Sequence, residues 1–129
     1  MKKEFIIVGS IIIFITVINI LSQWYVNNFF DAIINDINSI EEKIMKNDFE
    51  SGELEANIND VMSKWWERYD FFACFLEHDE LEKVEIQMIA INANIAIGDY
   101  GKGVDEIEKC KFILKHIEKK DSLKVVNIF

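Results

Sequence analysis

The chain begins with a long hydrophobic run. Residues 5–21 (FIIVGSIIIFITVINIL) contain no charged side chain, and Trp24 and Tyr25 extend the run. About 20 helical residues at 1.5 Å each span about 30 Å, which is the thickness of the hydrocarbon core of a bilayer. The pattern therefore predicts a transmembrane helix, with residues 1–25 as a cytoplasmic stub and membrane anchor and residues 26–129 as an extracytoplasmic helical domain.

Flanking charge predicts how this helix is oriented. Lys2 and Lys3 precede the run, and no basic residue follows it until Lys43. The positive-inside rule then places the N-terminus in the cytoplasm and the body outside, in a single-pass protein of the cell membrane. A cleaved secretory signal is the alternative, but residues 20–22 (ILS) match a small-residue cleavage site poorly, so we expect the anchor to be retained.

Beyond the anchor, apolar residues recur at spacings of three and four, which is typical of amphipathic helices. Turn-forming residues at 47–52, 77–79 and 98–103 separate four such stretches, so the fold class is expected to be all-α, a transmembrane helix followed by a bundle of about four helices. We expect the last helix to end near residue 120 and residues 121–129 to dock on the bundle. The four stripes are Val26, Phe30, Ile33, Ile37, Ile40 and Ile44; Leu54, Ile58, Val61, Trp65, Tyr69, Phe72 and Leu76; Leu81, Val84, Met88, Ile91 and Ile95; and Val104, Ile107, Cys110, Leu114 and Ile117.

The first stripe, from Val26 to Ile44, allows two interpretations. Its heptad-like seam either packs against the other helices of the same chain or pairs with a helix of a neighbouring protein. A Lys in place of Ile33 distinguishes them, because it would unfold the body only if the seam is intramolecular.

Composition narrows the functional classes. The formal charge is −9, from 14 basic and 23 acidic residues, and the three charged residues before the anchor contribute +1 of it, which leaves −10 on the body. A body this acidic repels phosphate backbones and anionic lipid, so nucleic-acid binding is not expected. Pro is absent, which favours long helices.

Several sequence blocks together are similar to those of one protein family. They are Lys2-Lys3 before the apolar run, Trp65-Trp66, residues 77–85 (EHDELEKVE), Ile107 to Ile117, and the ending Asn127-Ile128-Phe129. In these the chain resembles an uncharacterised domain-of-unknown-function family of short single-anchor membrane proteins from endospore-forming Gram-positive bacteria. The resemblance implies the architecture and the location, and it brings no catalytic signature.

The densest polar cluster surrounds His78. Glu77, His78 and Glu82 are candidate binding residues, and His78 and Glu82 share a face if one helix contains both. No Glu lies three residues before either His, and a metal site needs ligands from several elements, so we assign no metal. The plainer interpretation is a helix start whose acidic residues favour the helix dipole, with His78 solvated or bonded to a carboxylate.

A second candidate group follows in the second stripe. Trp66, Arg68 and Tyr69 lie within about one turn, and aromatic rings beside a guanidinium can bind a ligand or a partner. Trp65 lies on the apolar stripe and is expected in the core, whereas Trp66 flanks it. The plainer interpretation of Arg68, the only Arg, is an ion pair with Glu77 or Glu82.

No constellation predicts catalysis. Cys74 and Cys110 are the only cysteines, and the sequence leaves open whether they form a disulfide or remain buried thiols. Neither has a neighbouring His that would activate it, and no Ser lies in a G-x-S-x-G setting. We therefore expect no enzymatic activity and no cofactor.

These features favour a membrane-anchored, non-enzymatic protein-interaction module at the cell envelope, whose partner is another membrane or envelope protein. The alternative is a ligand- or metal-sensing helical bundle that depends on His78, Glu82 and Arg68. Replacement of His78 by Ala separates the two, because loss of ligand or metal binding without loss of folding would favour the alternative.

Overall fold

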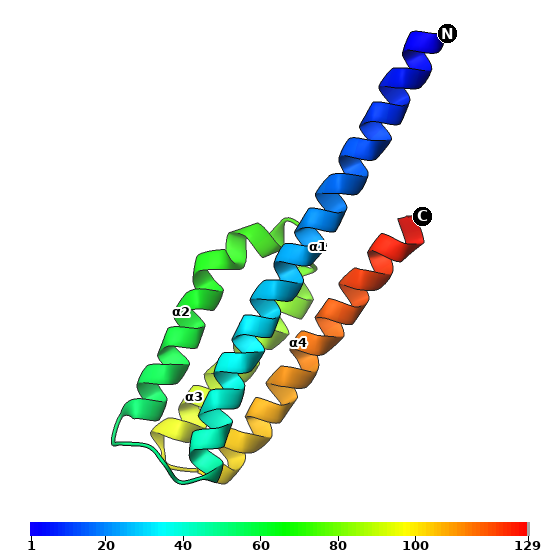
Figure 1. The fold of residues 1–129 in the computed structure, drawn as a ribbon. Helices are drawn as coiled ribbons and strands as arrows, with labels where there is room; N and C mark the ends of the chain where they lie inside the picture. The colour runs from blue at the N-terminus through cyan, green and yellow to red at the C-terminus, as the bar shows by residue number, and fades with distance from the viewer. Residues whose placement is uncertain (129) are drawn as a thin grey trace.

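Four helices build the chain, with no strand in residues 1–128 (Figure 1). The computed structural model describes the backbone of residues 1–128 and the side chains of residues 1–123. The helices are α1 (Lys2–Met45), α2 (Glu53–Ala73), α3 (His78–Ala96) and α4 (Tyr100–Ile128). The all-α prediction is confirmed, and the hydrophobic run and the first stripe of the body belong to one continuous helix.

The helices form an up-down-up-down bundle in which each helix contacts its two neighbours around the ring, α1 with α2 and α4, and α3 with α2 and α4. Short connections at residues 46–52, 74–77 and 97–99 reverse the chain between consecutive helices. Both chain ends lie at the same end of the bundle, where α1 continues well past its neighbours (Figure 1). This is the topology expected of four amphipathic helices joined by short loops.

The core is apolar throughout the residues that the structure describes, with no buried charged or polar residue. Its centre is aromatic: the Trp65 ring lies 5.6 Å from Phe30 and 6.1 Å from Phe72, measured between ring centroids. Such tilted pairs add to the free energy gained by burying large rings. From the first stripe, Val26, Phe30, Ile33, Ile37 and Ile40 are buried in this core and Ile44 packs against it.

The seam is thus intramolecular, which is the first of the two interpretations above. Its apolar side chains from Val26 to Ile40 are buried by helices of the same chain, and Ile44 is partly buried.

Two helix ends show why the chain turns where it does. Gly98 follows α3 with φ +78°, and the Asp99 N–H donates to the carbonyl of Asn94 at 2.9 Å. Asn47 follows α1 with φ +51° and the same hydrogen-bond pattern. Both ends are Schellman motifs, which need a residue that tolerates the left-handed region.

The structure moves three helix boundaries predicted from sequence. The turn after α3 is limited to residues 97–99, because the Asp99 carboxylate accepts a hydrogen bond from the Lys102 N–H and caps α4 at once. Helix α4 does not end near residue 120 but continues to Ile128. The expected docking of residues 121–129 on the bundle depends on side chains that lie mostly outside the described residues. The side chains of residues 124–129 lie outside the described part. Helix α2 ends at Ala73, so Leu76 is buried from the following turn.

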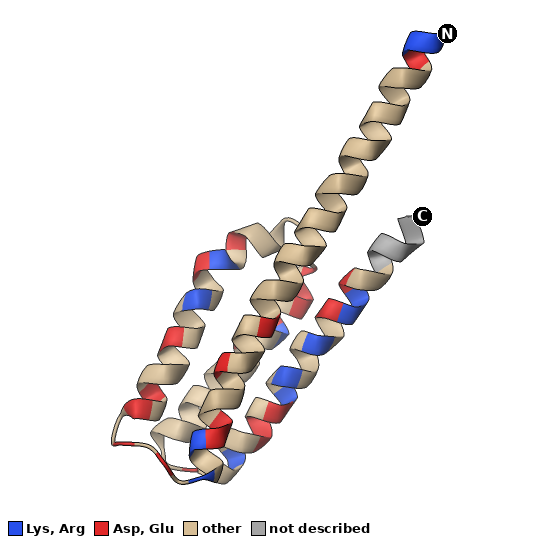
Figure 2. Ribbon diagram, viewed as in Figure 1, with Lys and Arg blue, Asp and Glu red and all other residues tan. Residues whose placement is uncertain are grey.

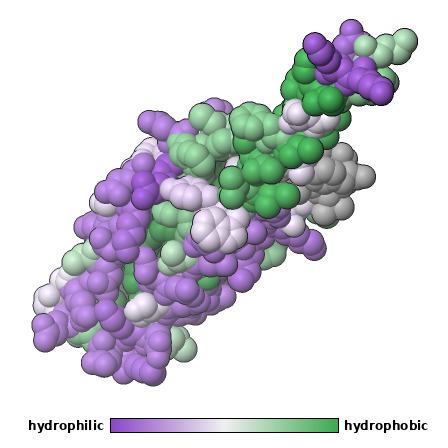
Figure 3. Space-filling view, turned by 45° about the horizontal axis from the view of Figure 1, so that its top comes forward, coloured by the Kyte–Doolittle hydropathy of each residue, from purple (hydrophilic) through white to green (hydrophobic). Residues whose placement is uncertain are grey.

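The N-terminal half of α1 projects from the bundle without a covering. No residue before Val26 is buried, and side chains from Phe5 to Leu21 include many large exposed hydrophobics. No charged residue lies between Glu4 and Asp31, so the projecting helix is uncharged between its tip and the bundle (Figure 2). α1 is long and apolar enough to cross a membrane. Hydrophobic surface covers the projection behind its polar tip (Figure 3).

Candidate functional site

The α2–α3 corner brings together part of the predicted binding set. The Trp66 and Tyr69 rings lie 5.3 Å apart between centroids, and the Tyr69 hydroxyl lies 3.5 Å from Nδ1 of His78. This distance is at the limit of a hydrogen bond. Three of the six candidates therefore form a chain of contacts from α2 to the first residue of α3.

The other three candidates lie apart from this chain. Glu77 Oε2 accepts a hydrogen bond from Lys120 Nζ at 3.1 Å, which ties the start of α3 to α4. Arg68 makes no ion pair with Glu77 or Glu82 in the structure, so the bridge considered above is wrong. Glu82 is exposed on α3. In the part of the chain that the structure describes, no group of three His, Cys, Asp or Glu side chains is placed to hold a metal ion.

Trp65 and Trp66 point in different directions, as the sequence predicts. The Trp65 side chain is fully buried, whereas Trp66 is 53% exposed. The indole nitrogen of Trp65 donates to Glu85 Oε1 at 3.3 Å, which satisfies a polar group at the edge of the core. The apolar stripes of the sequence do not predict this role of Glu85. A buried Trp needs an acceptor, but the pairing of α2 with α3 is needed to identify it.

Trp66 belongs to a small depression between α2 and α3. Its lining residues are Met62, Trp65, Trp66, Glu85, Met88 and Ile89, and we call Met62, Trp66 and Ile89 the α2–α3 apolar face. Ile89 is 56% exposed, so two large apolar side chains stand in solvent on adjacent helices. Single exposed apolar residues are ordinary, whereas neighbouring ones on a rigid surface are typical of contact sites.

Arg68 and the neighbouring aromatic residues line a different depression, where α1 leaves the bundle. We call this the α1–α2 cleft; its volume is about 590 Å³. Tyr25 packs edge-on against Phe71, with 4.8 Å between ring centroids, and Phe71 lies 5.1 Å from Phe75. The cleft is lined by Ile18, Leu21, Ser22, Trp24, Tyr25, Glu67, Arg68, Phe71 and Phe75. Helix α2 thus directs Trp66 toward α3 and Arg68 toward α1, so the two do not form one site.

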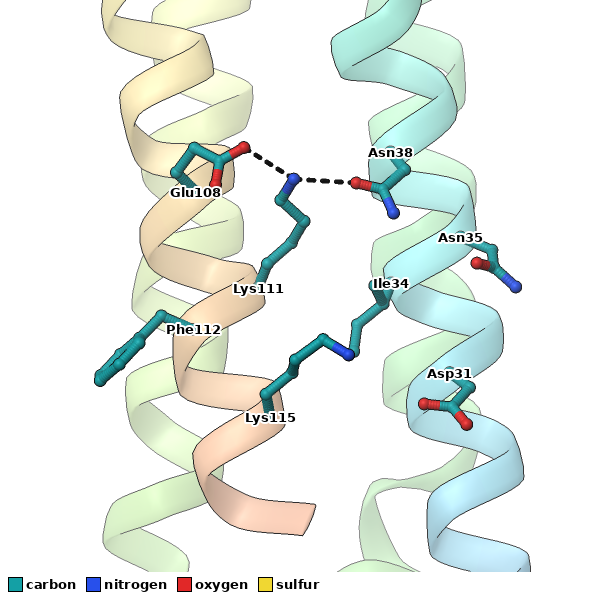
Figure 4. A pocket seen from close by; sticks show the side chains of 8 residues that line it. All are labelled: Asp31, Ile34, Asn35, Asn38, Glu108, Lys111, Phe112 and Lys115. Carbon is teal, nitrogen blue, oxygen red and sulfur yellow. Dashed lines mark hydrogen bonds and ion pairs between the residues drawn. The ribbon is translucent and has the colours of Figure 1, made fainter. Parts of the chain in front are cut away.

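A polar groove of about 700 Å³ lies on the surface between α1 and α4 (Figure 4). Lys111 closes part of it, because its Nζ lies 2.7 Å from Glu41 Oε2, 2.7 Å from Glu108 Oε1 and 2.9 Å from Asn38 Oδ1. The Lys111 hydrogen bond lowers the pKa of Glu108. Lys115 reaches across the groove toward α1 (Figure 4). Because its ammonium group is already surrounded by acceptors, Lys111 connects α4 to α1 by hydrogen bonds and ion pairs.

Glu118 lies beyond this groove on α4 and faces Asp31 of α1. Burial, and secondly the neighbouring Asp31 carboxylate, raise the pKa of Glu118 to about 7. Its Oε1 atom is buried and accepts no hydrogen bond from the residues that the structure describes. The pair was not found from sequence, because the two residues are far apart in the chain and neither belongs to a recognisable motif.

The two cysteines are unbonded and lie in unlike environments. Cys110 is fully buried in α4, and burial raises the pKa of its thiol to about 12. A thiol with so high a pKa supplies almost no nucleophilic thiolate near neutral pH. Cys74 is exposed in the connection after α2, so of the two alternatives left open by the sequence, the buried thiol describes Cys110 alone.

Comparison with known proteins identifies the family. The chain belongs to the family described as a domain of unknown function (DUF4363), which matches residues 20–128. The match covers the whole bundle and starts within the apolar half of α1. No curated protein and no solved structure matches the chain.

Proposed function

We propose that this DUF4363 protein is a single-pass, membrane-anchored helical module that acts by contacting another envelope protein rather than by catalysis. The observation that carries the proposal is the construction of α1. Its first half is apolar, uncharged and uncovered, and its second half is the first helix of a closed bundle. A lipid bilayer is the covering that an apolar helix of this length requires.

The proposed orientation places the N-terminus in the cytoplasm and the bundle outside, because Lys2 and Lys3 precede the apolar run and no other Lys or Arg occurs before Lys43. In this arrangement the short turn at 74–77 lies near the membrane, and the turns at 46–52 and 97–99 lie at the far end of the bundle.

The partner surface that we propose is the α2–α3 apolar face. Because the seam of α1 is used within the chain, Trp66 and Ile89 are the better candidates for an interface. Exposed Trp residues on a rigid helix pair are frequent centres of protein interfaces. A non-catalytic role is supported by the dispersal of the polar candidates over separate faces of the bundle.

Site-specific photo-cross-linking in native membranes tests this function. A photoreactive residue at position 89 should yield an adduct with one defined membrane or envelope protein, and the same residue in place of Phe112, which is 72% exposed on α4, should not. Trp66→Lys should remove the adduct from position 89 without altering the circular dichroism of the chain. Equal adducts from both positions, or adducts that survive Trp66→Lys, would contradict the proposed surface.

A further inference from the structure

The α1–α2 cleft combines an apolar wall with two unlike charges. Phe71 is 41% exposed and Phe75 is 40% exposed, and Trp24 across from them on α1 is 65% exposed. Arg68 and Glu67 lie at the polar side of the cleft, and neither forms an ion pair or a hydrogen bond with the side chains of residues 1–123. Lys64, the other cation of α2, differs from Arg68 because its Nζ donates to Asp36 Oδ2 at 3.0 Å.

We propose that the α1–α2 cleft binds one zwitterionic phospholipid of the leaflet that lies next to the bundle. Its phosphate would contact Arg68, its ammonium group would contact Glu67, and an acyl chain would lie along the aromatic wall. The inference rests on the membrane anchoring proposed above.

The apolar wall fits an acyl chain because it is continuous with the candidate span. Ile18 and Leu21 belong both to the cleft and to the apolar half of α1, and Phe71 and Phe75 extend the same surface onto the bundle. An acyl chain in the bilayer beside Ile18 can therefore follow the wall and passes only the Ser22 hydroxyl, which donates to the Asn19 carbonyl at 3.0 Å. Aromatic residues such as Trp24 and Tyr25 are enriched at this depth, where one end of a ring is apolar and the other wet.

The position of the charges fits the headgroup region. Arg68 lies one helical turn beyond Phe71 on the side away from the span, a rise of about 4.5 Å. It is thus placed just outside the hydrocarbon, where lipid phosphates lie. A guanidinium binds phosphate oxygens in a bidentate geometry, which Lys does not reproduce.

The net charge of the body favours a zwitterionic over an anionic lipid headgroup. The body carries −10, which disfavours an anionic headgroup overall. Adjacent Arg68 and Glu67 instead present one positive and one negative group, which complement the phosphate and the ammonium of phosphatidylethanolamine. Phosphatidylglycerol has the phosphate but lacks the ammonium, so it leaves Glu67 without a partner.

Native mass spectrometry of the full chain in detergent tests the site directly. The wild-type chain is titrated separately with phosphatidylethanolamine and phosphatidylglycerol of identical acyl chains, and the lipid-bound fraction is measured. We expect one lipid per chain with phosphatidylethanolamine preferred. Arg68→Gln should weaken binding of both lipids by about fivefold, the loss of one charge-assisted contact. Glu67→Gln should weaken only phosphatidylethanolamine and abolish the preference.

Matched variants distinguish lipid binding in the cleft from effects of charge or apolar surface elsewhere on the protein. Lys64→Gln removes a cation from the same helix, and Phe112→Ser removes an exposed ring from α4; both should bind lipid like the parent. Phe75→Ser should weaken both lipids. A wild-type preference for phosphatidylglycerol, no preference between the lipids, or unchanged binding by Arg68→Gln overturns the proposal. A chain dimer that Phe75→Ser dissociates would identify a second copy as the occupant and also overturn it.

Alkaline extraction of membranes distinguishes failure of this site from failure of the anchor. A wild-type chain released into the soluble fraction has no span, and both proposals are then wrong. A chain that stays in the membrane pellet but whose Arg68 and Glu67 variants bind lipid like the parent overturns the lipid site alone.

Discussion

Trp65 and Trp66 are adjacent residues of one helix with opposite environments, and their replacement by Ala provides a direct comparison. Trp65→Ala should lower the free energy of unfolding by about 3 to 5 kcal/mol, because it empties the centre of the core and leaves Glu85 without its donor. Trp66→Ala should cost less than about 1 kcal/mol. Urea unfolding of the full chain in detergent, followed by circular dichroism, measures both. Equal losses would mean that Trp65 is not the core residue.

Glu118 should make the stability of the bundle depend on pH. Its pKa is about 7 in the folded chain, above the ordinary value of 4.5 for a Glu side chain. The folded state then binds more protons than the unfolded state between these values, so stability is highest below pH 4.5 and falls as the pH rises toward 7. Because the carboxyl is partly exposed, water screens the effect. We expect the free energy of unfolding above pH 7 to be about 1 to 2 kcal/mol lower than below pH 4.5.

Glu118→Gln removes this titration. The variant should be more stable than the parent at pH 8, by about the same 1 to 2 kcal/mol, and no more stable at pH 4. Urea unfolding of both chains at the two pH values gives the comparison. A constant difference at both pH values would indicate a packing effect instead of a proton linkage.

At the scale of single residues, the sequence predicted burial better than contact. The stripe pattern separated Trp65 from Trp66 because burial follows the helical period. It did not predict that Lys120 would bind Glu77, or that Asp31 would face Glu118, because such contacts depend on which helices become neighbours. Arg68 was grouped with Trp66 by sequence distance, although helix rotation directs the two toward different helices.

At the scale of the helix, Gly98 and Gly101 form a matched pair for testing the turn before α4. Gly98→Ala should destabilise the chain by about 1 kcal/mol, because φ is +78° and an L side chain is strained there. Gly101 lies in the first turn of α4, where an added Cβ would meet Asp99 Oδ1 at 3.9 Å, an ordinary contact. Gly101→Ala should therefore stabilise the chain by about 0.4 to 1 kcal/mol. Thermal unfolding of both variants tests the opposite signs.

The four helices followed from the periodicity of the sequence, whereas several of their ends did not. Apolar stripes mark a helical face wherever it is buried, and they stop where the neighbouring helix stops. Helix α4 continues past Lys120 to Ile128, and Gly101 and Gly103 lie inside it despite their usual preference for turns. The Asp99 cap explains the early start, but a cap is recognisable only once the turn before it is known.

At the scale of the whole molecule, the two native cysteines allow a test of topology. A membrane-impermeant maleimide added to intact cells should label Cys74, which is exposed in a bundle that we place outside the membrane. Cys110 should react only after denaturation, because it is buried. Mass spectrometry of the labelled peptides measures both. Labelling of Cys74 only after permeabilisation would place the bundle in the cytoplasm, and Cys74→Ser provides the control for background.

The uninterrupted α1 joins its projecting half rigidly to the bundle. A helix of 44 residues without Pro is about 66 Å long, and nothing in its sequence provides a hinge where it enters the bundle. Transmembrane helices tilt when the thickness of the bilayer changes. In the proposed membrane-anchored arrangement about 30 Å of bundle lies beyond the membrane, so a tilt of about 10° would move the turns at 46–52 and 97–99 sideways by about 5 Å. In that arrangement the thickness of the bilayer sets the position of the far end of the bundle.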